Sequence, residues 1–256
     1  MQRLIFLVFL LVQFSACYAQ DYELFKKKGR VGFKDRSGKI VIEPLFDQAW
    51  DTFSMGVVGV KKEDKWGYID STGRQIVAFK YDEVGNFNPV VKLAIVFRDG
   101  KAGYINRSGR EIIPVIYDDL EQNFYENLVS ATKNNKSGCI NTNGKTVIPF
   151  VYETQNIKFR NSVAIVKERG KYGLIDKENK KIIPLKYDEI VEMEDVYRVK
   201  TGAKFGLVNK TGKELISCQY DNAIKYAKNI YALTSGDKTL YVNSLGEKTD
   251  KNGKKL

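Results

Sequence analysis

Residues 65–73 read Lys-Trp-Gly-Tyr-Ile-Asp-Ser-Thr-Gly, and recognisable versions of this stretch return along most of the chain. The clearest marker is the glycine that follows one variable residue. Its copies stand 35, 36, 35, 35 and 33 residues apart, at Gly32, Gly67, Gly103, Gly138, Gly173 and Gly206. A period of this length is typical of stacked supersecondary units, so the sequence predicts a repeat array.

Each unit is predicted to contain three antiparallel β-strands. Apolar residues alternate in the first strand, as at Val58 and Val60, which is typical of a half-buried strand. The second strand, 66–70, and the third strand, which contains Ile76 and Val77, carry apolar residues on both faces. We therefore expect neighbouring units to cover both faces of each small sheet.

The turn between the second and third strands carries the most specific local signal. Asp or Asn stands first and Gly fourth at residues 35–38, 70–73, 106–109, 141–144, 209–212 and 243–246. This pattern predicts a type I turn followed by a left-handed residue, where glycine has no Cβ penalty. The fifth unit has Asn179 in place of Gly, and Asn is the other residue that best tolerates this conformation.

Two features follow the third strand. Pro114, Pro149 and Pro184 cannot donate a ladder hydrogen bond, so they are expected to end the strand or to lie on an exposed edge. An aromatic residue and an acid come next, at 46–47, 81–82, 117–118, 152–153, 187–188 and 220–221. We expect each ring to pack between units and each carboxylate to cap the following bend, with a ligand-binding ring as the alternative.

These motifs resemble the WG-type β-repeat of bacterial proteins over about residues 22–246. Only Trp66 keeps the tryptophan, and Leu240 replaces the glycine of a seventh unit, which is therefore expected to be truncated. The resemblance implies an all-β fold with six three-stranded antiparallel repeats of about 35 residues plus the seventh piece, arranged as a propeller-like ring or an open superhelix. It implies no catalytic residue, metal or cofactor.

The N-terminal segment predicts the cellular location of the protein. Residues 1–19 carry Arg3, an apolar run of 11 residues and a small-residue segment, a pattern typical of a secretory signal peptide. The alternative is a lipoprotein anchored through Cys17. We expect an exported protein, periplasmic or extracellular or held at the outer membrane, with no transmembrane span. The array would occupy 20–250, with units starting near 22, 57, 93, 128, 163, 196 and 231, and 251–256 would be a frayed basic tail.

Composition narrows the chemistry. The chain has no histidine, which removes Ser-His and Cys-His catalytic pairs and histidine metal sites. Cys139 and Cys218 lack metal-site spacing and are expected to be small buried residues, although one disulfide between them is the alternative. The adjacent acids Asp118-Asp119 and Asp188-Glu189 would point to opposite faces of a strand, so they make a poor acid-base pair. We therefore expect no enzyme, and a carboxylate-dependent hydrolase ranks last.

The favoured function is a non-catalytic scaffold that binds another protein. Its loops, 85–90, 122–127 and 155–162, carry four aromatic residues that could contact the partner: Phe87, Phe124, Tyr125 and Phe159. The net charge of +11 supports the alternative of an anionic glycan or another polyanion, with no specific nucleic acid. Because basic and acidic residues are interspersed, a Lys-rich surface kept soluble by its charge is the favoured explanation of the net charge.

Overall fold

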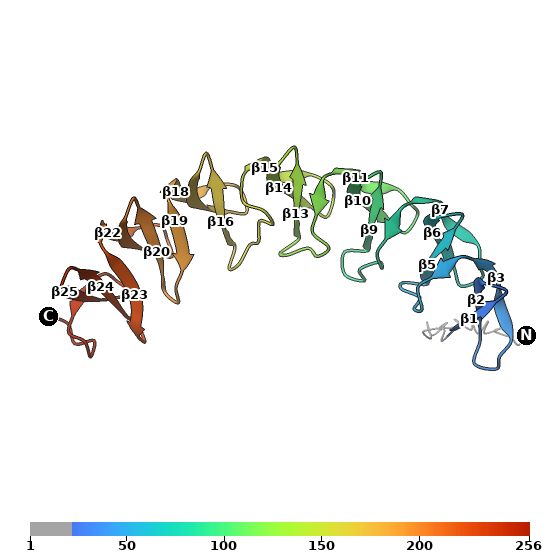
Figure 1. Ribbon diagram of the computed structural model, residues 1–256, viewed down its shortest axis with the longest axis horizontal. Helices are drawn as coiled ribbons and strands as arrows, with labels where there is room; N and C mark the ends of the chain where they lie inside the picture. Colours follow the sequence, from blue (N-terminus) through green and yellow to red (C-terminus); the bar gives the residue numbers. More distant parts are fainter. Residues whose placement is uncertain (1–21) are drawn as a thin grey trace, which may run out of the picture. The chain divides into compact units, whose positions relative to one another are not determined.

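The computed structural model describes residues 22–256, and every regular element in this range is a β-strand (Figure 1). The predicted signal peptide and Cys17 lie outside the described residues. The chain forms two compact units, the first ending at Lys80 and the second spanning Tyr81–Leu256. Seven small antiparallel sheets, numbered here in chain order, follow one another along the sequence.

Unit 1 contains the first two sheets. Sheet 1 consists of β1 (Glu23–Lys27), β2 (Arg30–Lys34) and β3 (Ile40–Phe46). Sheet 2 consists of β4 (Gln48–Ala49), β5 (Val57–Lys62), β6 (Lys65–Asp70) and β7 (Gln75–Tyr81), whose last residue begins unit 2.

Unit 2 contains the other five sheets. Sheet 3 consists of β8 (Glu83–Val84), β9 (Leu93–Arg98), β10 (Lys101–Asn106) and β11 (Glu111–Tyr117). Sheet 4 consists of β12 (Asp119–Leu120), β13 (Leu128–Lys133), β14 (Lys136–Asn141) and β15 (Thr146–Tyr152), and sheet 5 of β16 (Val163–Glu168), β17 (Lys171–Asp176) and β18 (Lys181–Tyr187). Sheet 6 consists of β19 (Glu189–Glu192), β20 (Val196–Thr201), β21 (Lys204–Asn209) and β22 (Glu214–Tyr220), and sheet 7 of β23 (Asn222–Ala227), β24 (Ile230–Ser235), β25 (Lys238–Asn243) and β26 (Lys248–Thr249).

The three predicted strands of each unit are present, and five sheets add a fourth that the sequence analysis did not predict. This strand has two to six residues, follows the aromatic-acid pair and pairs with the first long strand of the next unit, as β12 does with β13. The seventh sheet is truncated in its last strand, which has two residues where β22 has seven.

The repeated glycine of the second strand lies against the backbone of the third strand. The register of β10 and β11 shifts between the pairs Ala102↔Tyr117 and Tyr104↔Ile113, so residues 114–116 bulge opposite Gly103. A Cβ on any of the six glycines would lie 2.4–2.6 Å from the facing carbonyl oxygen, which is that of Ile113 for Gly103. Pro114 sits in this bulge on an edge strand, as the edge alternative predicted, because no ladder hydrogen bond is needed there.

The second turn of each unit has the predicted geometry. In sheet 3 the amide of Gly109 donates to the Asn106 carbonyl at 2.9 Å, and the Asn106 side chain accepts from the amide of Arg110 at 3.0 Å. Asn179 adopts a φ of 66°, which confirms it as the substitute for glycine. The same turn recurs at Asp250–Gly253, and the amide of Leu256 donates to Lys248 at 3.1 Å. The expectation of a frayed tail at 251–256 is therefore wrong, because this hairpin orders it.

Neighbouring sheets share apolar layers, as predicted. In unit 1, Phe33, Ile42 and Phe46 of sheet 1 pack against sheet 2, where Val58, Val60 and Ile69 form the other half of the layer. Trp66 is only half-buried, and its ring lies 6.2 Å from that of Trp50, centroid to centroid.

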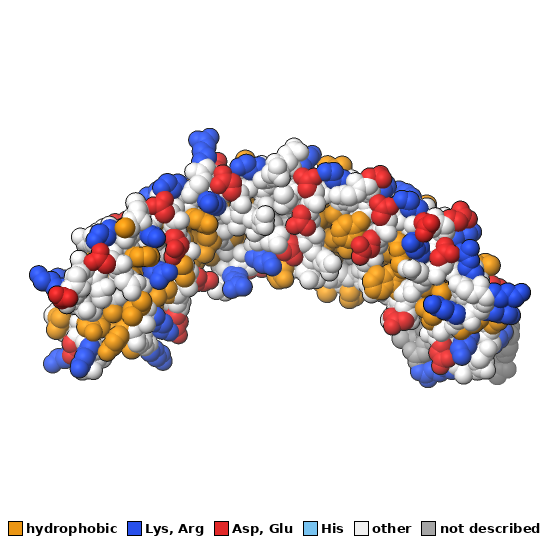
Figure 2. All heavy atoms as spheres, viewed as in Figure 1, with side chains coloured by type: hydrophobic (Ala, Val, Ile, Leu, Met, Phe, Trp, Pro, Cys, Tyr) orange, Lys and Arg blue, Asp and Glu red, His pale blue; other side chains and the backbone are white. Residues whose placement is uncertain are grey.

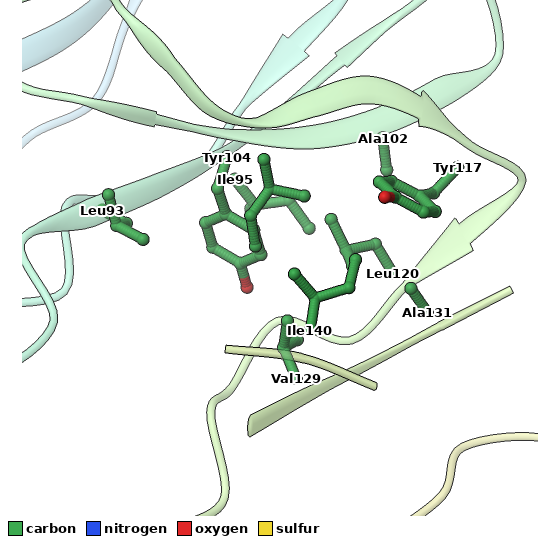
Figure 3. Packing of buried hydrophobic residues seen from close by; sticks show 10 residues of the cluster. Leu93, Ile95, Ala102, Tyr104, Tyr117, Leu120, Val129, Ala131 and Ile140 are labelled. Atoms are coloured by element: carbon green, nitrogen blue, oxygen red, sulfur yellow. The ribbon is translucent and has the colours of Figure 1, made fainter. Parts of the chain in front are cut away.

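In unit 2, the middle sheets are covered on both faces. One face of sheet 4, with Val129 and Ile140, packs against Tyr104 of sheet 3 (Figure 3). The other face, with Cys139 and Ile148, packs against sheet 5. Burying one large aliphatic side chain contributes roughly 1.5–3 kcal/mol, so these layers are a main source of stability. The rings of the aromatic-acid pairs lie in the layers, which confirms their packing role: Tyr117, Tyr152 and Tyr187.

Within each unit, the acid of the pair connects two neighbouring sheets. Asp118 accepts a hydrogen bond from Lys101 of sheet 3 and another, at 2.7 Å, from the amide of Asn134 in the first hairpin of sheet 4. The same arrangement joins Asp188 to Lys171 and to the Gly202 amide. The lysine ammonium, followed by the amide, holds the pKa of both aspartates below the usual range. The expected capping role of the acid is confirmed. Because the acid also binds a lysine of the preceding sheet, we call such an acid a clasp between the two sheets.

Replacing Gly103 with alanine should lower the free energy of unfolding by roughly 1–3 kcal/mol, the cost typical of overpacking. The added Cβ would meet the Ile113 carbonyl at 2.6 Å, and backbone cannot move aside as a flexible side chain can. Urea denaturation followed by circular dichroism measures the change. Gly202→Asn is the matched control, because φ is 58° there and nothing lies within 4 Å. Equal destabilisation by both variants would contradict the explanation.

The clasps should make the stability of the fold depend on pH in the acidic range. A carboxylate whose pKa is lower in the folded state contributes stability above its unfolded pKa, and that contribution is lost as pH falls through the folded value. The pKa values of the clasp acids Asp118, Asp188 and Asp221 are lowered. The pKa of Asp70, which lies in the second turn of sheet 2, falls to about 2 from 3.8 and adds to the same dependence. We expect the thermal midpoint to fall between about pH 4 and pH 2.

The variant Asp118→Asn should flatten this dependence and lower the midpoint at pH 7, because it keeps the shape of the side chain and removes its charge. Asp237→Asn, at an exposed hairpin position, is the control and should leave the pH profile unchanged. A profile for Asp118→Asn that superimposes on that of the parent chain would show that the clasp contributes nothing measurable.

Candidate functional site: a groove beside sheet 5

The sheets of unit 2 have two different margins. Two-residue hairpins such as 99–100 and 169–170 join the first and second long strands at one margin, which we call the hairpin margin. The start of β9 pairs with the end of β10 through Leu93↔Asn106, so the loop before β9 lies at the opposite margin. We call this the loop margin, and it carries the longer loops 85–92, 121–127 and 153–162 (Figure 1).

Contacts between elements of successive sheets hold the loop margin together. The Glu126 carboxylate in loop 121–127 accepts from the Ser162 amide at 3.3 Å and pairs with Lys177 in the second turn of sheet 5. Lys177 is the main cause of the lowered pKa of Glu126. Lys158 pairs with Glu121 at 3.5 Å. The loops of sheets 4 and 5 therefore form one continuous surface.

A groove of about 300 Å³ opens at this surface between sheets 5 and 6. Its volume lies at the lower end of the range for small-ligand pockets, which is roughly 300–1,000 Å³. Its floor is apolar and comes from sheet 5, one wall comes from the loop before β16, and the other wall comes from sheet 6. Val163, Ile165 and Leu174 form the floor. Asn156, Lys158 and Arg160 form the wall from the loop, and Glu192 and Tyr197 form the wall from sheet 6.

The groove has an uneven charge. Glu192 is neutralised by Lys210 at 2.8 Å, and the same ammonium lies 4.3 Å from the centre of the Tyr197 ring. Burial, followed by Glu192, raises the pKa of Tyr197 to about 12, so its hydroxyl stays protonated at neutral pH. The Arg160 side chain is exposed and has no ion pair among residues 22–256. An apolar floor beside a free guanidinium suits a ligand that combines apolar and anionic groups.

The four aromatic residues proposed from sequence differ in how far their side chains are exposed. Phe87 and Phe159 are 2% and 4% exposed, so the expectation that they contact a partner is wrong. Phe159 is buried because it packs between sheets 4 and 5. Phe124 is half-buried, with its ring 5.1 Å from that of Tyr104. Only Tyr125, at 42% exposure, remains available at the loop margin, 5.8 Å from the Lys158 ammonium.

Sequence reasoning did not find the groove residues Arg160, Ile165 and Tyr197. A usable signal lay nearby, because the residue two places after the acid is apolar for five of the six aromatic-acid pairs and is Gln155 for the fourth pair. A polar residue in an apolar column marks a place where the repeat is incomplete.

The adjacent acids serve the structure. Asp118 and Asp188 are clasps, Asp119 accepts from the Leu120 amide at 2.9 Å, and Glu189 pairs with Arg198 at 2.9 Å. Within the described part of the chain, no three His, Cys, Asp or Glu side chains are grouped as metal ligands. Residues 22–256 contain no helix with the length and hydropathy of a membrane span.

The surface charge is mixed. Figure 2 shows acidic and basic side chains interspersed over the face in view. Many of the lysines are paired, among them Lys101, Lys136, Lys171 and Lys204, which belong to the clasps. A mixed surface of this kind gives weaker support to polyanion binding than one continuous basic face would.

The geometry and the sequence can be placed among known proteins. Six consecutive segments match the WG containing repeat, at 32–66, 66–101, 103–136, 138–172, 172–205 and 205–238. The chain belongs to the WG containing repeat family. In this WG repeat chain the six matches carry the six glycines that face the third-strand bulge. No curated protein sequence matches the chain.

Several solved structures show a loose likeness to the WG repeat chain. A eukaryotic initiation factor matches with a TM-score of 0.38 and 12% identity, over 89% of this chain and 72% of that one. Hsv2p of Kluyveromyces lactis matches at 0.34 and 7%, over 87% and 89%. PorZ, a surface component of the type-IX secretion system of Porphyromonas gingivalis, matches at 0.31 and 9%, over 77% and 33%.

The two described cysteines are both free thiols in different sheets. Cys139 is fully buried between sheets 4 and 5, as expected from sequence, and burial raises its pKa to about 12. Cys218 is half-buried in β22, and burial raises its pKa as well.

Because the thiolate is the reactive form, Cys139 should resist N-ethylmaleimide at pH 8 while the chain is folded. Cys218 should react faster, and both should react fully in 6 M guanidinium chloride. Peptide-resolved mass spectrometry separates the two sites from each other and from Cys17. Rapid native labelling of Cys139, or a disulfide-linked peptide that joins the two sites, would contradict the packing described for sheet 4.

Proposed function

We propose that this WG repeat protein is a non-catalytic scaffold that binds a partner protein outside the cytoplasm through the loop margin of unit 2. Export is supported by the signal-peptide pattern of residues 1–19. The scaffold role is supported by the repeats, in which the longer loops project from stacked sheets.

The groove beside sheet 5 is the observation that carries the proposal. It combines an apolar floor with an unpaired cation, Arg160, and the ammonium of its wall residue Lys158 lies 5.8 Å from the centre of the exposed Tyr125 ring. Exposed aromatic and arginine side chains beside an apolar pocket are the residue types that dominate protein interfaces. The acids considered for catalysis are engaged in clasps, an ion pair or a backbone hydrogen bond, which favours binding over hydrolysis.

Site-specific crosslinking tests the proposal. With p-benzoylphenylalanine in place of Asn156 or Tyr125, irradiation of cells that make the protein should give a discrete protein adduct. The same photoreactive residue in place of Arg169, an exposed residue of the hairpin margin of the same sheet, is the matched control. We expect several-fold more adduct from the loop-margin positions.

Equal adducts at the three positions would contradict a specific binding margin. Capture of acidic carbohydrate without any protein would contradict the scaffold and would favour the glycan alternative. Salt dependence separates these cases, since binding to a polyanion weakens steeply with added salt.

A further inference from the structure

Sheet 5 lacks the short first strand that its neighbours have. Val84, Leu120 and Ile190 each lie in such a strand, two residues after the clasp acid, and each is at least nine-tenths buried. The corresponding residue of sheet 5, Gln155, is exposed and lies in the loop. Sheet 1 also has three strands, but the residues before it lie outside the described range.

The missing strand leaves an unpaired backbone segment on β16. Successive residues of an edge strand point their amide and carbonyl alternately inward and outward. Lys167 is satisfied on the outward side by the Glu153 amide and the Thr154 hydroxyl, and Val163 is satisfied by Arg160. Ile165 lies between them, and among residues 22–256 its outward amide and carbonyl have no partner.

The carbonyl at the same position is paired in the neighbouring sheets 3 and 4, and the whole residue is paired in sheet 6. The carbonyl of Ile95 in sheet 3 accepts from the Gly85 amide at 2.8 Å, and that of Ser130 in sheet 4 accepts from the Glu121 amide at 3.0 Å. In sheet 6, Arg198 pairs with Val191 of β19. The open edge at Ile165 is therefore a departure from the repeat.

The chain's own loop is held away from this edge. The Ile157 amide donates to the Ser130 hydroxyl of sheet 4 at 2.8 Å, and both Ile157 and Phe159 are buried between sheets 4 and 5. Pulling the loop onto β16 would expose both side chains. Ile157 and Phe159 thus fill the layer between sheets 4 and 5, as Leu120 helps to fill the layer between sheets 3 and 4. The backbone edge of β16 stays unpaired at Ile165.

The open edge coincides with the groove. Val163 and Ile165 of β16 form part of the groove floor, so the groove lies beside the backbone position that lacks a partner. Arg160, which has no ion pair among the described residues, and Lys158 lie on the wall beside it. Glu192 on the opposite wall is neutralised by Lys210, so the local field favours an acidic occupant.

We propose that β16 receives an extended acidic segment of the partner protein, which pairs with Ile165 and completes sheet 5 as its fourth strand. This inference rests on the scaffold function proposed above and specifies the chemistry of the partner. Backbone hydrogen bonds to the edge supply affinity, and an acid near Arg160 with an apolar residue over the groove floor supplies specificity.

The probe is a fluorescent peptide, Asp-Glu-Ile-Val-Glu-Met, acetylated and amidated at its ends. It copies residues 188–193, which include the strand β19 that fills the same edge in sheet 6. Fluorescence anisotropy with the full chain should show saturable binding. Hydrogen exchange should slow at the amide of Ile165 in the bound chain.

Two methylated peptides test strand addition directly. By analogy with the Val191↔Arg198 pair, N-methylation of the peptide valine removes the donor to Ile165 and should weaken binding by about tenfold or more. The same methyl group on the isoleucine one residue earlier, where the amide points away from β16, should have a much smaller effect. Equal affinity for the two methylated peptides would overturn the proposal.

The protein variant Arg160→Glu should weaken binding by about fivefold or more at low salt, while Arg169→Glu at the other end of the sheet should not. A peptide with both glutamates changed to glutamine should lose the same factor on the parent chain. Displacement of the peptide by heparin, with equal effects of both methylations, would assign the groove to an anionic glycan and overturn the proposal.

Failure of this inference differs from failure of the scaffold. If crosslinks to a protein form at Asn156 but the peptide neither binds nor protects Ile165, the scaffold stands and strand addition is wrong. If a dimer forms through β16 in light scattering and is lost in Ile165→Pro but not in Ile165→Val, the occupant is a second copy of this chain. That outcome also overturns the proposal of an acidic partner.

Discussion

The structure depends on mutual burial between small sheets. A sheet of three or four short strands has two apolar faces and cannot bury either of them alone. Sheet 4 shows the solution, since Val129 and Ile140 pack toward sheet 3 while Cys139 and Ile148 pack toward sheet 5. Each repeat is thus part of the core of its neighbours, and contact with the next repeat along the chain replaces the long-range packing of a globular domain.

Two further constraints fix how closely the sheets and strands approach. The repeated glycine admits the bulge of the third strand, because a Cβ at Gly138 would lie 2.5 Å from the Ile148 carbonyl oxygen. The clasp acid then ties the hairpin margin of one sheet to that of the next, as Asp221 does by accepting from Lys204 and from the Gly236 amide. The hairpin margin is therefore committed to structure, and the loop margin is where the repeats vary.

The sequence was sufficient to predict the repeat, its three long strands, the turns and the packing of the aromatic rings, because each rests on local patterns that recur six times. It was less informative where a residue has two possible environments. Phe87 and Phe159 are aromatic residues in predicted loops, yet both are buried, because a loop can fold its apolar side chains under itself. The fourth strand was missed because in sheets 2, 3 and 4 it has only two residues, which carry too little periodicity to be recognised.

The candidate site could not be predicted because it arises from what one repeat lacks. In five units an apolar residue two places after the clasp acid draws the chain onto the neighbouring strand, and that short pairing hides the strand edge. The polar side chain of Gln155 would gain nothing from burial at this position. Ile157 and Phe159 are buried instead, and they anchor the loop to sheet 4. One polar substitution in a repeated column therefore leaves the layer between sheets 4 and 5 intact and opens an edge beside it. A local departure of this kind keeps the core filled and leaves the outward backbone groups of Ile165 without a partner among the described residues.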